Sequence, residues 1–400
     1  MKAENTCRWI VALLIFAWLP GNIQAAETAY TLSGPYTHSN LQIFLIHGQE
    51  SITNQKYMTL TEAMQKKIVL VHETGNVQQL AIENTSKEVN VFIHSGDIVK
   101  GGRQDRVISF DVIIPPSSGK VPLNSFCVES GRWSKRGKES TGMFASNSNM
   151  VSSRKLRIAS KYEMNQGNVW SNVAEQQKKL NHNMKIISGN NDIDVTANAS
   201  GSSLQLTLES QELKQMAGEY LKQLNSLIEG KDNVLGFAFL INGEINNADV
   251  YGRRDLFADL WPKLLGAAVV EAISEYQQPK QATPKEILSR RLRTVEGIAT
   301  MFTKVKKAKE SKRDVNDRTQ LVAKESQNHF LFETRDQKVA GKWLHRNYIK
   351  KDPNAKKVPP PSNRRNPSGL GLRNNNSDMP QQQRIRSNQK SNNLEQTPIF

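Results

Sequence analysis

A series of short β-branched segments, separated by turn residues, constrains the fold of this chain most. Ile68–Val71, Val77–Ile82 and Val89–Ile93 are three such segments, and Gly-Asn, Asn-Thr and Gly-Asp pairs bound them. Apolar runs of this length between turn residues predict β-strands. Short connections favour antiparallel pairing, because parallel strands need long crossovers. We therefore predict an antiparallel β-rich lobe over residues 41–133.

Two longer apolar runs complete this lobe. Val107–Ile114 is more apolar than a half-exposed strand requires, so we predict one central strand that ends at Pro115. Val121–Val128 alternates between two faces, as a strand with two different environments does. The following segment, Gly131–Arg157, is rich in Ser, Gly, Asn, Lys and Arg, and we predict an exposed loop there.

The pattern changes to mixed helices and strands over residues 158–349. Asn242-Gly243 separates two strand-like runs and is a strong signal for a two-residue hairpin. Apolar residues at helical spacing predict three helices, the first stopped by Gly230. The predicted helices are Leu213–Ile228, Asp255–Tyr276 with Pro262 inside it, and Glu286–Lys309, and the predicted strands are Val234–Ile241, Glu244–Tyr251, Phe330–Glu333 and Trp343–Ile349.

The first 25 residues have the pattern of a secretory signal peptide. Lys2 and Arg8 precede the apolar run Trp9–Leu19, and small residues lead to a cleavage site before Ala26. The apolar run is shorter than the ~20 residues that span a bilayer, and no later run reaches that length. We predict export to the periplasm or beyond the cell, with an uncleaved N-terminal anchor as the alternative.

Charge indicates which surfaces the chain could contact, and cysteine content indicates whether it can form a disulfide. The formal net charge is +16, and much of it lies near the C-terminus, where Gly341–Phe400 contains twelve Lys and Arg residues and three acidic residues. Few apolar residues occur in 350–400, so we predict a disordered basic tail that could contact an anionic surface. Cys127 is the only cysteine left after removal of the signal segment, so no internal disulfide can form.

Polar residues gather at turns beside the two apolar runs of the β-rich lobe. We predict a ligand-binding edge in which these residues converge, because glycines and arginines together suit an anionic ligand. Trp133 beside the second group could stack on a planar ligand or close the end of a core. The alternative is that the arginines pair with the acids and only fix the turns. The predicted residues are Arg103, Gln104, Asp105, Arg106, Glu129 and Arg132.

No motif for catalysis or for metal binding accompanies these residues. The phosphate loop ending GK[ST], the GxSxG elbow and paired metal-ligand spacings such as HxxxH and CxxC are all missing. Cys127 lies in an apolar run, where a free thiol usually packs as a small hydrophobe. Asp192 and Asp194 supply too few oxygens for calcium. We predict no metal or cofactor and assign no catalytic residue.

Several passages together resemble one family. They are SGDIVKGGRQDR, CVESGRW, NQGNVWSNV and GFAFLINGEINNADVYGRRDLFADLWPKLL. They resemble the ARG and rhodanese-phosphatase-superfamily-associated protein domain, over roughly residues 41–349. The family has no established activity to transfer to single residues. Its association with ADP-ribosylglycohydrolase and rhodanese/phosphatase proteins implies a link to nucleotide or ADP-ribose metabolism.

Two functions remain open from the sequence. The first is an exported ligand-binding or scaffold protein of the cell envelope, with an α+β fold. The second is an enzyme that acts on a phosphorylated or ADP-ribose-like ligand, as the resemblance implies. A pocket with converging arginine and carboxylate groups would favour the enzyme, whereas a fully ion-paired cluster would favour the scaffold.

Overall fold

The computed structural model describes residues 30–145, 147, 149, 153–196, 200–278, 283–305 and 308–351. The predicted signal peptide lies outside these residues, and so does the predicted tail beyond Lys351. Helices and mostly antiparallel sheets form the described chain, which confirms the predicted α+β class. None of the described helices is both long and apolar enough to cross a membrane.

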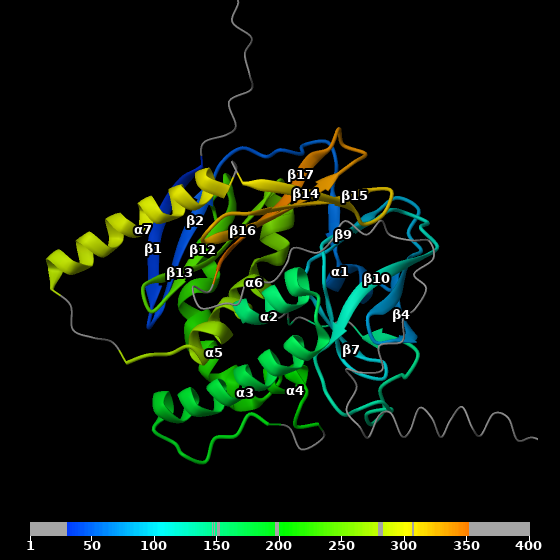
Figure 1. Cartoon of the computed structure of the whole chain (residues 1–400), viewed down its shortest axis with the longest axis horizontal. Coiled ribbons are helices and arrows are strands. Elements are labelled where there is room, and N and C mark those ends of the chain that lie inside the picture. The colour runs from blue at the N-terminus through cyan, green and yellow to red at the C-terminus, as the bar shows by residue number, and fades with distance from the viewer. Residues whose placement is uncertain are drawn as a thin grey trace, which may run out of the picture.

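An eight-stranded antiparallel sheet joins the two ends of the described chain (Figure 1). The second of the two N-terminal strands pairs with the central hairpin, which in turn pairs with the last of the C-terminal strands. The predicted division into a β-rich lobe and a mixed lobe stays a prediction. In sheet order the strands are β1 (Thr31–His38), β2 (Leu41–His47), β12 (Val234–Ile241), β13 (Glu244–Tyr251), β17 (Lys342–Lys350), β16 (His329–Asp336), β15 (Thr319–Glu325) and β14 (Lys309–Asp314).

Both faces of this sheet are covered by helices. In β2, Ile43 and Leu45 face one core while Phe44 and Ile46 face another, as the two-residue period of a strand dictates. The first core includes helix α6 (Arg254–Ser274), and the second includes helix α7 (Pro284–Lys304). Because both faces are buried, β12 is apolar along its whole length rather than alternating.

The remaining strands form two smaller sheets. The six-stranded sheet has the order β11 (Phe144–Ala145), β7 (Ile98–Gly101), β8 (Arg106–Ile108), β10 (Lys120–Cys127), β5 (Gln79–Asn84) and β4 (Val69–Asn76). The three-stranded sheet consists of β3 (Tyr57–Thr59), β6 (Asn90–Ile93) and β9 (Val112–Ile114). β3 and β6 are parallel, whereas β6 and β9 are antiparallel.

The prediction of one strand over Val107–Ile114 is wrong. β8 ends at Ile108 and β9 begins at Val112, and the two strands belong to different sheets. Polar groups separate them: Ser109 donates its N–H to Asn124 O at 3.0 Å, and the Asp111 carboxylate accepts the Ser95 N–H at 2.7 Å. These bonds hold the chain in a turn between the strands.

Helices α3 (Gln166–Ser188) and α5 (Gln211–Leu224) both pack against α6, which lies on the large sheet, and α3 also contacts β10 of the six-stranded sheet. Helix α5 buries Leu213, Ala217, Tyr220 and Leu224, which share one face at helical spacing. Its predicted stop, Gly230, has a φ of 67°. Besides α6 and α7, the helices are α1 (Leu60–Gln65), α2 (Arg154–Ile158), a π-helix (Ala159–Glu163), α3 (Gln166–Ser188), α4 (Leu204–Leu208), α5 (Gln211–Leu224) and a 3-10 helix (Asn225–Ile228).

Two helical predictions need correction. Helix α7 ends at Lys304, and Lys309 already belongs to β14, so the predicted helix Glu286–Lys309 is too long. Helix α3, which spans 23 residues, was missed. Its buried positions include Gln176, Gln177 and Asn183, so its inner face is too polar to give a clear hydrophobic period.

Candidate functional site

The first candidate site is a set of buried ion pairs at one edge of the six-stranded sheet. Asp105 lies in the turn between β7 and β8, and Glu129 lies two residues after the end of β10. Because β8 and β10 are neighbouring antiparallel strands, the turn meets the end of β10, and Val128 donates its N–H to Asp105 O at 3.0 Å. The arginine–carboxylate cluster consists of Asp105, Glu129, Arg132, Arg136 and Glu139.

Two guanidinium groups bind the two most buried carboxylates of the cluster. Asp105 accepts both Nη atoms of Arg136 at 2.8 Å, which makes a bidentate pair. Glu129 Oε2 lies 2.7 Å from Arg132 Nη2, and Arg136 also contacts Glu139 at 2.9 Å. Burial opposes the charge of Arg136, but hydrogen bonds to Asp105 and Glu139 outweigh burial, so the pKa of Arg136 lies above its ordinary value.

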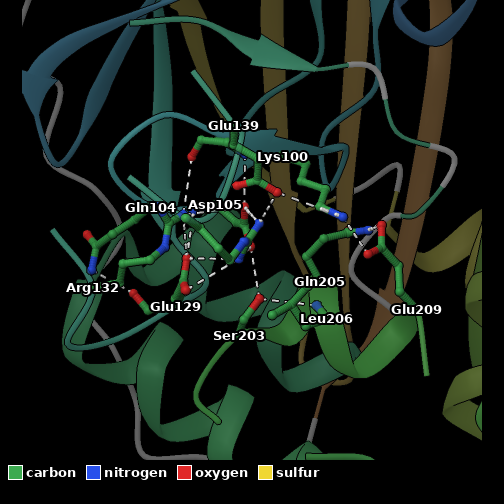
Figure 2. Close-up of polar contacts among 12 residues, drawn as sticks. Lys100, Gln104, Asp105, Glu129, Arg132, Glu139, Ser203, Gln205, Leu206 and Glu209 are labelled. Atoms are coloured by element: carbon green, nitrogen blue, oxygen red, sulfur yellow. Dashed lines mark hydrogen bonds and ion pairs between the residues drawn. The ribbon is translucent and has the colours of Figure 1, made fainter. Parts of the chain in front are cut away.

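Neutral donors complete the coordination of Asp105. The Gly101 N–H donates to it at 3.0 Å. The Ser203 hydroxyl also donates to it, at 2.9 Å (Figure 2). Ser203 is also the N-cap of α4, since its hydroxyl accepts the Leu206 N–H at 3.1 Å. Gln104 Nε2 donates to Glu129 O at 2.8 Å. The cluster therefore fastens the β7–β8 turn and the loop after β10 to the helical layer.

Arg103, Arg106 and Trp133 lie beside the cluster. The Arg103 and Arg106 guanidinium carbons lie 5.4 Å and 5.6 Å from the centre of the Trp133 ring. Arg106 is fully buried and binds Cys127 Sγ at 2.5 Å and Glu73 at 3.4 Å. Arg103 is only half-buried, and among the described residues its guanidinium group has no hydrogen-bond acceptor.

The six predicted site residues lie at the same edge of the sheet. Arg132 donates to Gly101 O and Gly102 O at 3.3 Å, so the two arginine-bearing segments meet. Sequence reasoning missed two partners, Arg136 and Glu73, which bind Asp105 and Arg106. Arg136 lies in a segment whose composition predicts only a loop. The one local sign that Arg136 would form an ion pair was Glu139, an acid three residues later.

Cys127 is unsuited to nucleophilic catalysis. Its side chain is fully buried, and burial raises the pKa of the thiol to about 11 even though Arg106 opposes this shift. A reactive cysteine needs the opposite shift, toward the thiolate at neutral pH. Cys127 therefore acts as a buried packing residue that also meets the Arg106 guanidinium group.

A second candidate site is buried where the three-stranded sheet meets the eight-stranded sheet. His345 in β17 donates or accepts through both ring nitrogens, with Nδ1 at 2.7 Å from Asp111 Oδ2 and Nε2 at 3.0 Å from Asp249 Oδ1. The His94 ring lies 4.8 Å from the His345 ring. All four side chains are at most 4% exposed. The histidine cluster consists of His94, Asp111, Asp249 and His345.

Charges in the histidine cluster perturb one another strongly. Burial and the neighbouring His345 lower the pKa of His94 to about 4. For Asp111, burial favours the neutral acid, but Lys161 and His345 outweigh it and hold its pKa well below the usual range. Burial lowers the pKa of His345, but Asp111 and Asp249 raise it by more, so the pKa lies above its ordinary value. Strongly perturbed groups that share one buried site mark a candidate functional site.

Sequence reasoning missed the histidine cluster. His94 follows β6, Asp111 precedes β9, and the other two members lie in β13 and β17. No pair of them has the spacing of a metal motif, and only the pairing of β13 with β17 brings Asp249 close to His345. One signal was available, because Asp249 lies between Ala248 and Val250 in a predicted strand, and a carboxylate buried there requires a partner.

The comparisons with known proteins concern this whole folded region. No curated protein and no solved structure matches the chain at a significant level. A family model does match it, over residues 29–349, which includes both candidate sites. The match covers most of the 400 residues and confirms the resemblance drawn from the sequence motifs. The chain belongs to the family of the ARG and Rhodanese-Phosphatase-superfamily-associated Protein domain.

Proposed function

We propose that this chain is an exported ligand-binding or scaffold protein of the cell envelope, and that it binds an anionic ligand through Arg103. In this proposal the arginine–carboxylate cluster is the rigid support, and Arg103 on Trp133 is the contact surface. The observation that carries the proposal is the environment of Arg103. It is half-buried on the Trp133 ring and has no acceptor in the described chain.

The stacked arrangement suits anion binding. A guanidinium group that lies over an aromatic ring keeps its edge donors free for a carboxylate or phosphate while its face is covered. Arg103 N–H donates to Glu73 Oε2 at 3.3 Å, so the backbone of the residue is fixed. A fixed backbone and a packed ring reduce the entropy that the side chain loses on binding.

The ion pairing of the cluster favours this proposal over an enzyme acting on a phosphorylated or ADP-ribose-like ligand. Arg132 donates to Glu129 and to three backbone carbonyls, and Arg136 donates to Asp105 and Glu139. The Nη donors of both arginines are therefore occupied within the protein, and their Nε atoms are buried. An enzyme of that class needs convergent donors that remain open to the transferred or cleaved phosphate group.

Ligand-induced stabilisation tests the proposal. The mature chain is melted with phosphate, pyrophosphate, ADP-ribose and short dicarboxylates, and we expect at least one anion to raise its Tm. Arg103→Gln should abolish that rise without lowering the Tm of the free protein. Arg254→Gln removes another surface guanidinium, 38% exposed, and should leave the rise intact.

Two results would contradict ligand binding at Arg103. One is an anion-induced rise of Tm that persists in Arg103→Gln. The other is no rise with any anion, which would leave only the scaffold role. Export is tested separately, since N-terminal sequencing of the protein from the periplasmic fraction should begin at Ala26. Recovery of the unprocessed chain from the cytoplasm would contradict export.

A further inference from the structure

The histidine cluster holds a buried ring nitrogen without a partner. His94 is 4% exposed, and its Nε2 has no hydrogen-bond partner among the described residues. The other nitrogen, Nδ1, lies 2.6 Å from Ser95 O. A carbonyl oxygen only accepts, so Nδ1 carries the hydrogen and Nε2 of the neutral ring carries a lone pair. A buried lone pair without a donor is costly unless something absent from the protein chain binds it.

A second ring nitrogen and a carboxylate face the same point. His345 Nδ1 lies 2.7 Å from Asp111 Oδ2, which leaves Nε2 directed at Asp249 Oδ1, 3.0 Å away. One nitrogen of His94, one nitrogen of His345 and one oxygen of Asp249 all lie within 4.8 Å of one another. Donor atoms around a tetrahedral metal ion are ~3.3 Å apart, so side-chain shifts of about 1 Å would complete the site.

The surrounding groups hold these three donors in place. Asp111 fixes the His345 ring and itself accepts from Ser95 N–H at 2.7 Å and from the Thr334 hydroxyl at 2.6 Å. A carboxylate that binds the distal nitrogen of a histidine is the usual support of a metal ligand. Asn347 Nδ2 donates to Asp249 Oδ1 at 2.7 Å, and Asn247 Nδ2 donates to Oδ2 at 2.6 Å.

A small polar cavity adjoins the donors. Its volume is about 10 Å³, close to the room that a single water molecule needs. His94, Asp249 and Ser109 line it, and the Ser109 hydroxyl also lacks a partner among the described residues. Lys161, on the π-helix, forms another part of the wall and donates to the Ser95 hydroxyl at 2.9 Å.

We propose that His94 Nε2, His345 Nε2 and the Asp249 carboxylate bind one divalent transition-metal ion, with a fourth position open to this cavity. Two imidazoles and one carboxylate suit Zn²⁺ or Fe²⁺, whereas Ca²⁺ and Mg²⁺ prefer oxygen ligands alone. Asp111 and Asp249 offset the nearby positive charge of Lys161. The open position would hold one water molecule. This proposal does not depend on the anion-binding function of Arg103.

Metal titration of the purified full-length chain tests this site. After removal of metal with a chelator, Zn²⁺ should bind with one saturable site per chain and raise the Tm. His94→Gln and Asp249→Asn should abolish that binding. Asp111→Asn, which loosens His345 without removing a ligand, should weaken it about 10–100-fold. His182→Ala removes an exposed imidazole and should bind Zn²⁺ like the unmodified chain.

A crystal structure of the unmodified chain tests the site even if a variant fails to fold. Crystals of the unmodified chain soaked in Zn²⁺ should show anomalous density between His94, His345 and Asp249. Density only elsewhere, or no density in a fully soaked crystal, would overturn the proposal. Saturable binding that survives in a folded His94→Gln variant would overturn it as well. Loss of binding in that variant together with density at the cluster would establish the site.

Discussion

Single charged residues of the arginine–carboxylate cluster contribute to stability because their partners are buried. Arg136→Gln removes the bidentate partner of Asp105 and one partner of Glu129, both of which are 0% exposed. A buried carboxylate that loses its partner costs about 3–5 kcal/mol. We expect the free energy of unfolding, measured by urea denaturation, to fall by about that amount.

An exposed ion pair provides the matched control for this prediction. Lys66 and Glu62 pair at 2.8 Å on the surface of α1, with both side chains well exposed. Exposed pairs at this spacing contribute about 0.5 kcal/mol or less. Lys66→Gln should therefore leave the unfolding transition almost unchanged. Equal losses in the two variants would mean that Asp105 and Glu129 do not depend on Arg136.

Cys127 provides a second prediction at the residue scale. With a thiol pKa of about 11, only about one molecule in a thousand carries the thiolate at pH 8. Iodoacetamide should therefore label the folded mature chain very slowly at pH 8 and faster as the pH rises toward 11. Unfolding in urea should restore ordinary reactivity. Rapid labelling of the folded chain at pH 8 would show that the thiol is neither buried nor shifted.

At the scale of single residues, the sequence identified several charged residues of the candidate site but not the residues that they contact. Arg103, Asp105, Glu129 and Arg132 stood out because glycine turns and strand ends surround them. The pairing of Asp105 and Glu129 with Arg136 depends on how a loop folds back, which no pattern around either acid encodes. His94 and His345 are harder still to pair from sequence, because their contact depends on two sheets meeting.

Two glycines in different elements give opposite predictions at the scale of the element. A β-carbon on Gly236 would lie 2.0 Å from the backbone oxygen of Asp249, so Gly236→Ala must push β12 and β13 apart. Such overpacking costs about 3 kcal/mol or more. In α5, a β-carbon on Gly218 meets nothing within 4 Å. Gly218→Ala should raise the free energy of unfolding by about 1 kcal/mol, because alanine favours the helix.

Thermal and urea melting of both glycine variants measures this difference. A destabilised Gly218→Ala variant would mean that this face of α5 packs against another group. A Gly236→Ala variant as stable as the unmodified chain would mean that the two strands are further apart than the structure has them.

Elements with strong local signals were predictable, and elements set by tertiary contacts were not. The hairpin of β12 and β13 matches its predicted bounds, because an Asn-Gly turn and two apolar runs specify it locally. The run Val107–Ile114 misled the prediction, since its break depends on two hydrogen bonds, one from Ser95 N–H to Asp111 and one from Ser109 N–H to Asn124 O. Helix α3 was missed because buried amides interrupt its apolar face.

The whole molecule yields a prediction about the basic C-terminal segment. Residues 352–400 carry eight Lys and Arg residues and three acidic residues. The buried cores lie within residues 30–351, so we expect removal of 352–400 to leave the Tm unchanged. The full chain should bind anionic lipid vesicles, and added salt should weaken that binding because it screens exposed charges.

Vesicle sedimentation at increasing salt concentration measures this binding, with neutral vesicles as the control. The truncated chain should remain in solution with either kind of vesicle. Equal binding of the full and truncated chains to anionic vesicles would mean that the folded region supplies the contact. A lower Tm of the truncated chain would mean that the removed segment packs against the described cores.

The most direct test of the central claim is a crystal structure of the mature chain with the anion that raises its Tm most. We predict density for the anion within hydrogen-bond distance of the Arg103 guanidinium group, with Arg132 and Arg136 still paired with Glu129 and Asp105. An anion bound between Arg132 and Arg136, with those carboxylates displaced, would contradict the account. An anion bound away from Arg103 would contradict it equally.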